Sequence, residues 1–168
     1  MTISMYQATV PTMIRALDNL AAFLEKGRQF AEAKKIDPSV LVSSRLAPDM
    51  LPLAKQVQIA SDTCKGGAAR LAQQTPPSFE DNETTFPELI ERARKTVAYL
   101  KTLKPEQIDG SEDRTVTWTT RSGAKEMKGQ PYLLHHVLPN VFFHVTTAYG
   151  ILRHNGVEIG KKDYLGPI

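Results

Sequence analysis

The sequence predicts a mainly helical fold, a bundle of four long helices with one small β-hairpin inserted between the third and the last. In four separate segments, apolar residues recur at three- and four-residue steps, the spacing of a buried helix face. One further segment, residues 115–120, instead alternates with period two. The 168 residues, 41% hydrophobic and 23% charged, suit a single globular domain that spans 1–168.

The first helix is expected over residues 4–35. Its apolar stripe is made of Met13, Ala16, Leu17, Leu20, Phe23 and Leu24. Pro11 leaves two alternatives, because proline is tolerated in a first helical turn but disturbs a later one. Either the helix begins near Pro11, or an earlier turn precedes it and is kinked there.

The second and third helices are separated by a predicted loop. After a turn at 37–39, the second helix is expected to begin near Pro48 and to reach Leu71. Its stripe is made of Met50, Leu53, Val57, Ala60, Cys64 and Leu71. Residues 74–82 include two adjacent prolines and are expected to form the loop. Thr85 followed by Glu88 is the pattern of a capping box, so the third helix is expected from Phe86 to Leu100.

The remaining segments complete the predicted bundle. Residues 115–120 are rich in β-branched side chains and are expected as a strand, which turns at 121–123 and returns over 124–127. Because an isolated hairpin is only marginally stable, Val116 and Trp118 are expected to face the helices. The last helix is expected from Pro139 to about His154. The tail after it, with Tyr164 and Leu165, is expected to pack on the bundle or across a dimer interface.

Composition restricts the classes of partner. The formal net charge is only +3, and basic and acidic residues are mixed along the chain, so no nucleic-acid partner is expected. No segment approaches the roughly 18 apolar residues of a membrane helix. Cys64 is the only cysteine and lies in an apolar stripe, so it is expected to contribute packing. A single cysteine and no visible secretory signal together favour a cytoplasmic location.

Four stretches of sequence resemble a known family. They are RLAPDM at 45–50, QVQIASD at 56–62, EDNETTF at 80–86, and the long run 139–153 that continues through 160–166. Together they resemble domain-of-unknown-function family 1993, a branch of the DinB/YfiT-like four-helix-bundle superfamily, over almost the whole chain. The resemblance implies up-down-down-up connectivity and a homodimer, and it implies no assigned activity.

The resemblance also raises the question of a metal site. Many DinB-like relatives hold a divalent ion with three histidines, one from the second helix and two that lie four residues apart on the last helix. The histidines of this chain are His135, His136, His144 and His154. The second helix therefore has none, and the residue four after His144 is Ala148. The comparison implies that the three-histidine site is lost, so no metal and no cofactor are expected.

Two residues are the catalytic candidates, His144 and Asp62. His144 borders the apolar stripe of the last helix, where it is either an acid–base group or a buried imidazole with a hydrogen-bond partner. Gln58, Asp62 and Lys65 share one side of the second helix. Asp62 therefore either meets His144 or forms an ordinary exposed pair with Lys65. Gln56 is the alternative to Gln58 as the inward-facing amide.

The candidate ligand-binding residues are Gln58, Asn140, Tyr149, Arg153 and Trp118. Arg153 suits an anionic group, although an arginine near a helix C-terminus also interacts with the helix dipole. Trp118 and Tyr132 are expected to supply aromatic contact area. The acids at 80, 81 and 83 lack the spacing of a calcium loop and are expected to interact with the dipole of the third helix.

Three functional interpretations remain open at this point. The first is a metal-free bundle with a small-molecule pocket between the second and fourth helices. The second is a metal-independent enzyme of the isomerase, dehydratase or transferase type that uses His144 as acid or base. The third is a divalent-metal enzyme with nonstandard ligands drawn from Asp62, Gln58 and His144.

Overall fold

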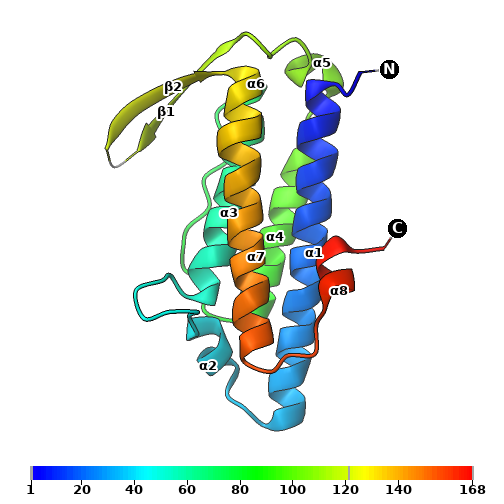
Figure 1. Cartoon of the computed structure of the whole chain (residues 1–168), viewed down its shortest axis with the longest axis vertical. Coiled ribbons are helices and arrows are strands. Elements are labelled where there is room, and N and C mark those ends of the chain that lie inside the picture. Colours follow the sequence, from blue (N-terminus) through cyan, green and yellow to red (C-terminus); the bar gives the residue numbers. More distant parts are fainter. Residues whose placement is uncertain (1, 121, 168) are drawn as a thin grey trace.

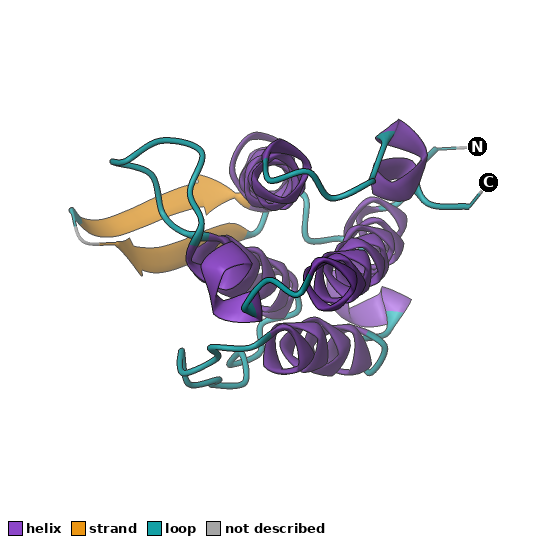
Figure 2. Cartoon of the chain, turned by 90° about the horizontal axis from the view of Figure 1, so that it is seen from below, coloured by secondary structure: helices purple, strands orange, loops and turns teal. Residues whose placement is uncertain are grey.

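Four long helices form the body of the protein (Figure 1). The computed structural model describes residues 2–120 and 122–167. The long helices are α1 (Met5–Lys34), α3 (Leu53–Leu71), α4 (Phe86–Leu100) and α7 (Leu138–His154). Seen end-on they surround one core, and the hairpin projects to one side (Figure 2). The predicted helical fold with a small two-stranded hairpin is thereby confirmed.

The connectivity places α3 and α4 side by side in the same direction. In Figure 1, α1 and α7 run downward, whereas α3 and α4 both run upward. The chain must therefore travel back along the bundle between α3 and α4. The 19 residues of α3 span about 28 Å. Residues 72–85, called the crossover below, make this return without helix or strand.

Most predicted helix faces are buried as expected. The stripe residues Met13, Leu17 and Leu20 on α1 have no exposed surface, and burial raises the pKa of the Cys64 thiol on α3. Of the two alternatives at Pro11, the earlier turn exists, since Ser4 caps the helix and Pro11 lies inside it. Within the described part of the chain, no helix combines the length and apolar character needed to cross a membrane.

The segment before α3 differs from the prediction. A short helix, α2 (Pro38–Ser43), begins where only a turn was expected. The second long helix does not begin near Pro48 but at Leu53, with Pro52 as its N-cap. The residue before a proline is disfavoured in helical conformation, so Leu51 cannot easily extend the helix backward. The Leu53 amide instead donates to the Ser44 carbonyl at 3.0 Å.

The third long helix has the predicted bounds. Thr85 Oγ1 accepts from the Glu88 amide, and Glu88 Oε2 accepts from the Thr85 amide at 2.9 Å, so the capping box is present. A short helix, α5 (Pro105–Ile108), follows α4 and leads to the hairpin.

The hairpin consists of β1 (Thr115–Thr120) and β2 (Gly123–Lys128), paired antiparallel. Arg121, placed in the turn by the sequence, lies outside the described residues. Val116 is buried and Trp118 is half-buried, both on the face toward the helices. The inward orientation expected for this pair is therefore confirmed.

The last helical run begins ten residues earlier in the chain than Pro139, where the sequence had placed its start. It comprises α6 (Gly129–Pro131), a π-helical turn η1 (Tyr132–Val137) and α7 without interruption. A proline inside an α-helix lacks an amide donor and clashes with the carbonyl four residues earlier. The wider π-turn just before Pro139 changes that local geometry and lets the chain remain helical.

The C-terminal tail packs on the bundle, one of the two predicted arrangements. Its short helix α8 (Lys161–Leu165) lies against α1, as Figure 1 shows. Lys26 on α1 pairs with Asp163 at 2.5 Å. Tyr164 accepts a hydrogen bond from the Thr146 hydroxyl at 2.9 Å, and its ring packs edge-on against Tyr149 with 6.0 Å between the ring centres.

Candidate functional site

His144, on α7, is held against α3 by a hydrogen bond. Its Nδ1 lies 2.7 Å from Oε1 of Gln56, and Nε2 of Gln56 donates to the Leu51 carbonyl at 2.9 Å. Because the amide nitrogen of Gln56 is used by Leu51, its oxygen faces the imidazole and must accept. The proton of the neutral ring is therefore on Nδ1, and Nε2 carries the lone pair. Gln56, rather than Gln58, is the amide that meets His144.

The free nitrogen of His144 keeps contact with solvent. The residue is only 8% exposed. Its Nε2 atom has no hydrogen-bond partner within the described residues and is not fully buried, so it reaches solvent. Burial lowers the pKa of His144 below its ordinary value of 6.5. The ring is consequently neutral at pH 7. It presents a hydrogen-bond acceptor whose direction is fixed by Gln56.

Asn140 adds a second acceptor beside His144. It lies four residues earlier on α7, so both side chains occupy the same helix face. Its Nδ2 donates to Thr63 Oγ1 on α3 at 3.2 Å, which leaves Oδ1 available to accept. The seam between α3 and α7 therefore carries two acceptor atoms, Nε2 of His144 and Oδ1 of Asn140, and the second N–H group of the Asn140 amide.

The residues around His144 do not fit the three-histidine metal site of DinB-like relatives. One imidazole nitrogen and neutral amides form a weak donor set for zinc or nickel. In the part of the chain that the structure describes, no three His, Cys, Asp or Glu side chains are placed to share an ion.

Asp62 belongs to a different polar centre. Its Oδ1 lies 2.9 Å from Lys65 Nζ and 2.8 Å from Arg92 Nη2. The pair with Lys65 is therefore formed, but it is not the ordinary exposed pair that the sequence suggested, because Lys65 is buried and Asp62 also binds Arg92. His144 and Asp62, which the sequence allowed to meet, have separate partners.

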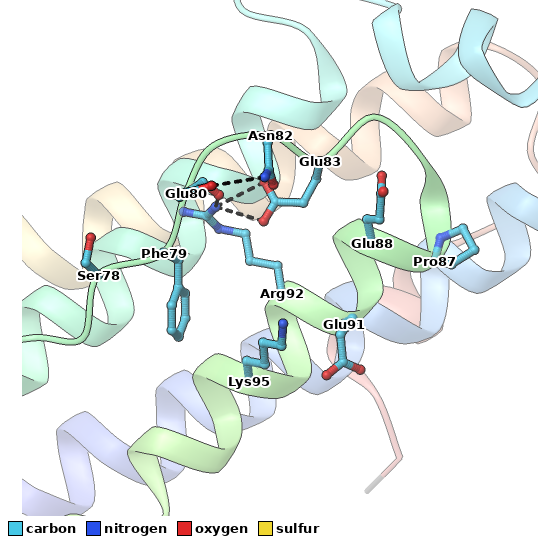
Figure 3. A pocket seen from close by; sticks show the side chains of 10 residues that line it. All are labelled: Ser78, Phe79, Glu80, Asn82, Glu83, Pro87, Glu88, Glu91, Arg92 and Lys95. Carbon is cyan, nitrogen blue, oxygen red and sulfur yellow. Dashed lines mark hydrogen bonds and ion pairs between the residues drawn. The ribbon is translucent and has the colours of Figure 1, made fainter.

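Arg92 on α4 lies at the middle of this second centre (Figure 3). It is only 2% exposed. Its Nη1 donates to Glu83 Oε1 and to the Glu80 carbonyl, both at 2.9 Å, and its Nη2 lies 2.9 Å from Asp81 Oδ1. Burial opposes its charge, but the hydrogen bond that Arg92 donates to Glu83 and the charge of Asp62 raise the pKa of Arg92 above its ordinary value.

Charges in the Arg92 centre are balanced. Lys55 pairs with Asp81 as Lys65 pairs with Asp62, so three cations face three carboxylates. Gln58, the other predicted site amide, donates to Glu83 Oε2 at 2.9 Å. A cavity of about 570 Å³ lies between the crossover and α4, and Arg92, Glu80 and Glu83 of this centre line it. The acidic residues of segment 80–83 therefore do more than interact with the dipole of α4, because they bind the crossover to α3 and α4.

The other predicted ligand-binding residues are dispersed. Trp118 packs on Tyr132 and His136 at ring separations of 4.9 and 4.8 Å, where it attaches the hairpin to η1. Tyr149 contacts Phe23 edge-on at 6.1 Å, and Arg153 is exposed near the end of α7. Of the predicted set, Asn140 is the residue that the structure places beside His144.

Sequence reasoning missed Arg92. A signal was present, since Arg92 follows Leu89 by three residues and precedes Thr96 by four, which places it on the buried face of its helix. A charged residue in that position requires opposite charges nearby. The acids at 80–83 were the available partners.

Four long helices with a small hairpin between the third and the last define the class of protein as a DinB-like helical bundle. The family model for the domain of unknown function DUF1993 matches residues 5–165, and the chain belongs to this family. It is also similar to a solved DinB family member protein from Shewanella denitrificans. The identity is 44% and the TM-score 0.89, with 97% of this chain and 92% of that chain covered. No curated protein matches the chain.

Replacing Arg92 with methionine is expected to lower the free energy of unfolding by about 3–5 kcal/mol, because the substitution leaves the carboxylate of Glu83 without a countercharge. Urea denaturation measures this change. Arg94→Met is the matched control. Arg94 lies two residues further along α4, on the exposed side, and its replacement is expected to change the free energy of unfolding by less than about 0.5 kcal/mol. Equal losses in the two variants would contradict the role assigned to Arg92.

The lowered pKa of His144 predicts a pH-dependent stability. The unfolded chain binds a proton on His144 at a higher pH than the folded chain does. The stability that the neutral imidazole contributes is therefore complete above about pH 6.5 and is lost as the pH falls toward the pKa of the folded state. Between pH 7 and pH 5, wild-type protein is expected to lose more stability than His144→Gln. The exposed His135→Gln is the control and should follow wild type in urea titrations at each pH. Parallel curves for all three proteins would refute the assignment.

Proposed function

We propose that the chain is a metal-independent small-molecule-binding protein whose site lies at the seam between α3 and α7. The observation that carries this proposal is the fixed, neutral imidazole of His144, with Nε2 open to solvent. A neutral imidazole with one nitrogen held by the protein has one nitrogen left to accept a hydrogen bond. Here Gln56 orients the ring and leaves one nitrogen for a ligand.

The neighbouring surface of α7 supports this location. A groove of about 580 Å³ follows the outer face of the helix. It is lined by Leu46, Pro139, Phe142, Phe143, Thr146, Thr147, Tyr149 and Gly150. Phe143 connects the groove to the site, because its ring packs edge-on against His144 with 5.1 Å between the ring centres. A ligand with an apolar body would place that part in the groove and its polar part beside Nε2.

A metal-independent enzyme is the second candidate function. An imidazole with a fixed tautomer and a lowered pKa is able to accept a proton at neutral pH. Isomerase, dehydratase or transferase chemistry would use that step. We rank it below binding, because the partner of His144 is the amide of Gln56, which does not titrate and cannot supply a second proton.

We also propose that the protein is a cytoplasmic homodimer. Large apolar side chains remain exposed beside α7, with Phe143 at 56% and Leu46 at 41%. Phe142 lines both the groove that includes Leu46 and a second hollow that includes Leu165, so the apolar surface is continuous. A second copy of the chain would cover this surface symmetrically, and a ligand in the groove would then lie at the dimer interface.

The binding proposal is tested with tag-free protein purified without chelator. Metal content is expected below about 0.1 ion per chain, since the donor set is weak. Uncharged aromatic fragments at millimolar concentration are expected to shift amide NMR signals of α3 and α7, and His144→Ala is expected to abolish those shifts. Stoichiometric metal that is lost in His144→Ala would contradict the proposal and favour the nonstandard metalloenzyme. Fragment shifts confined to other helices would contradict it as well.

Light scattering after size exclusion tests the dimer. Wild-type protein is expected at twice the chain mass, and Phe143→Ser is expected to raise the dimer dissociation constant at least tenfold, because it removes an exposed ring from the apolar surface. Leu134→Ser is the matched control, since Leu134 is 43% exposed but lies in η1. A monomeric wild type, or equal effects of the two substitutions, would exclude this interface.

A further inference from the structure

We propose that the loop at residues 44–52, called the cap loop below, acts through Gln56 to decide whether Nε2 of His144 accepts or donates a hydrogen bond. The cap loop contains the run RLAPDM at 45–50 and lies where α3 begins (Figure 1). This inference rests on the proposed binding function, because it concerns how that site is regulated. It makes Arg45 a positioning residue for His144.

The cap loop is closed on itself by hydrogen bonds. At its ends, the Leu53 amide donates to the Ser44 carbonyl at 3.0 Å. Across the loop, Arg45 donates through Nη1 to the Met50 carbonyl at 2.7 Å. Because the Met50 carbonyl is held, the next peptide group, which carries the carbonyl of Leu51, has a defined direction.

Gln56 relays this direction to the imidazole. Its Nε2 donates to the Leu51 carbonyl at 2.9 Å, and its Oε1 lies 2.7 Å from Nδ1 of His144. A side-chain amide has its donors on the nitrogen and its acceptor on the oxygen, so the partner of the nitrogen decides where the oxygen points. With the Leu51 carbonyl in place, the ring donates from Nδ1, and its Nε2 is an acceptor.

The same relay predicts a second arrangement when the cap loop moves away. Gln56 then loses its acceptor, and its amide is free to turn over and to donate to Nδ1 of His144. A neutral imidazole that accepts at Nδ1 carries its proton on Nε2. The nitrogen that reaches solvent thereby changes from acceptor to donor, and the ligand that it is able to bind changes with it.

Exposure makes the cap loop the mobile part of this relay. Arg45 and Leu51 are exposed, and the loop forms no helix or strand. Gln56 and His144, by contrast, are only 2% and 8% exposed. Segments with little buried surface open locally at a lower free energy than packed helices do. The loop therefore moves more readily than the two side chains that it controls.

A contact at Leu46 links the cap loop to the groove on α7. A Cβ atom at Gly150 would lie 3.3 Å from Cδ1 of Leu46, so the missing side chain of Gly150 leaves the place that Leu46 occupies. Leu46 also lines the groove, as Phe143 does. A ligand in the groove would contact the cap loop, so occupation of the groove and the hydrogen-bonding state of His144 are linked.

Replacing Arg45 with methionine tests the inference without any ligand. The variant loses the bond to the Met50 carbonyl and is expected to fold, because Arg45 is exposed. Long-range proton–nitrogen NMR spectra at about pH 8, where imidazoles are neutral, identify the ring nitrogen that carries the proton. We expect Nδ1–H at His144 in the wild type and a tautomer ratio shifted at least about threefold toward Nε2–H in Arg45→Met, as the loss of one hydrogen bond allows.

Arg94→Met, on the exposed side of α4, is the matched control and is expected to leave the tautomer ratio of His144 unchanged. An unchanged ratio in Arg45→Met, or the same shift in both variants, would overturn control by the cap loop.

A double substitution tests whether Arg45 acts through Gln56. Methionine at position 56 neither donates to the Leu51 carbonyl nor accepts from His144, so the ratio should no longer depend on the loop. Adding Arg45→Met to Gln56→Met is therefore expected to change the ratio by less than about 1.5-fold. A further shift as large as that in the wild-type background would overturn the relay.

Gly150→Leu tests the contact at Leu46. The new side chain would displace Leu46 and is expected to shift the tautomer ratio in the same direction as Arg45→Met. Ala98→Leu, on the exposed side of α4, is the control and should have no effect. An unchanged ratio in Gly150→Leu would exclude the link between the groove and His144.

The aromatic fragments that test binding separate this inference from the proposed function. If the ratio responds to Arg45→Met but fragments leave α3 and α7 unshifted, the cap loop controls His144 and the binding function is wrong. If fragments shift α3 and α7 but the ratio does not respond, the binding function stands and control by the cap loop is wrong.

Discussion

A positive charge buried between the crossover and two parallel helices constrains the whole bundle. Because α3 and α4 run in the same direction, residues 72–85 must travel the length of the bundle without helix or strand of their own. Such a segment gains little from local hydrogen bonds and needs an anchor. Arg92 supplies it, since its guanidinium binds Glu83, Asp81 and the Glu80 carbonyl on the crossover as well as Asp62 on α3. The geometry of a forked, always charged donor group suits four acceptors better than an ammonium would. The crossover is therefore held by side-chain charge instead of backbone pairing.

The two polar centres differ in charge. Around Arg92, cations and carboxylates balance, and the terminal nitrogens of the guanidinium are all engaged by acceptors on neighbouring elements. Around His144 the two hydrogen-bonded side chains, Gln56 and Asn140, are neutral amides, and Gln56 fixes the imidazole so that Nε2 carries the lone pair. A charged cluster that binds its own countercharges anchors the chain, whereas a neutral group held in a fixed direction is suited to a ligand. This contrast is the reason for assigning a structural role to the larger cluster and a binding role to the smaller one.

Local signals in the sequence predicted most of the fold. The Thr85–Glu88 capping box and the alternation at 115–120 each depend on neighbours in the chain, and both were confirmed. The helical run through Pro139 was missed, because a proline at a helix start and a proline after a π-turn look alike in sequence. The partner of His144 was harder to predict, because it depends on contacts between helices that are distant in the sequence. Gln56 and Gln58 are both buried, and only the packing of α3 on α7 decides which of them meets His144.

The π-turn η1 has a consequence for the histidines of the last helical run. In an uninterrupted α-helix, residues 136, 140 and 144 would lie in one row, and two histidines would flank Asn140 on the same surface. The wider turn changes the angular phase between its two sides, so the row is divided. His136 packs on Trp118 of the hairpin, and His144 turns toward α3. One irregular turn thus separates two imidazoles that the sequence spacing alone would align. It allows one continuous helical run to place the first imidazole against the hairpin and the second against α3.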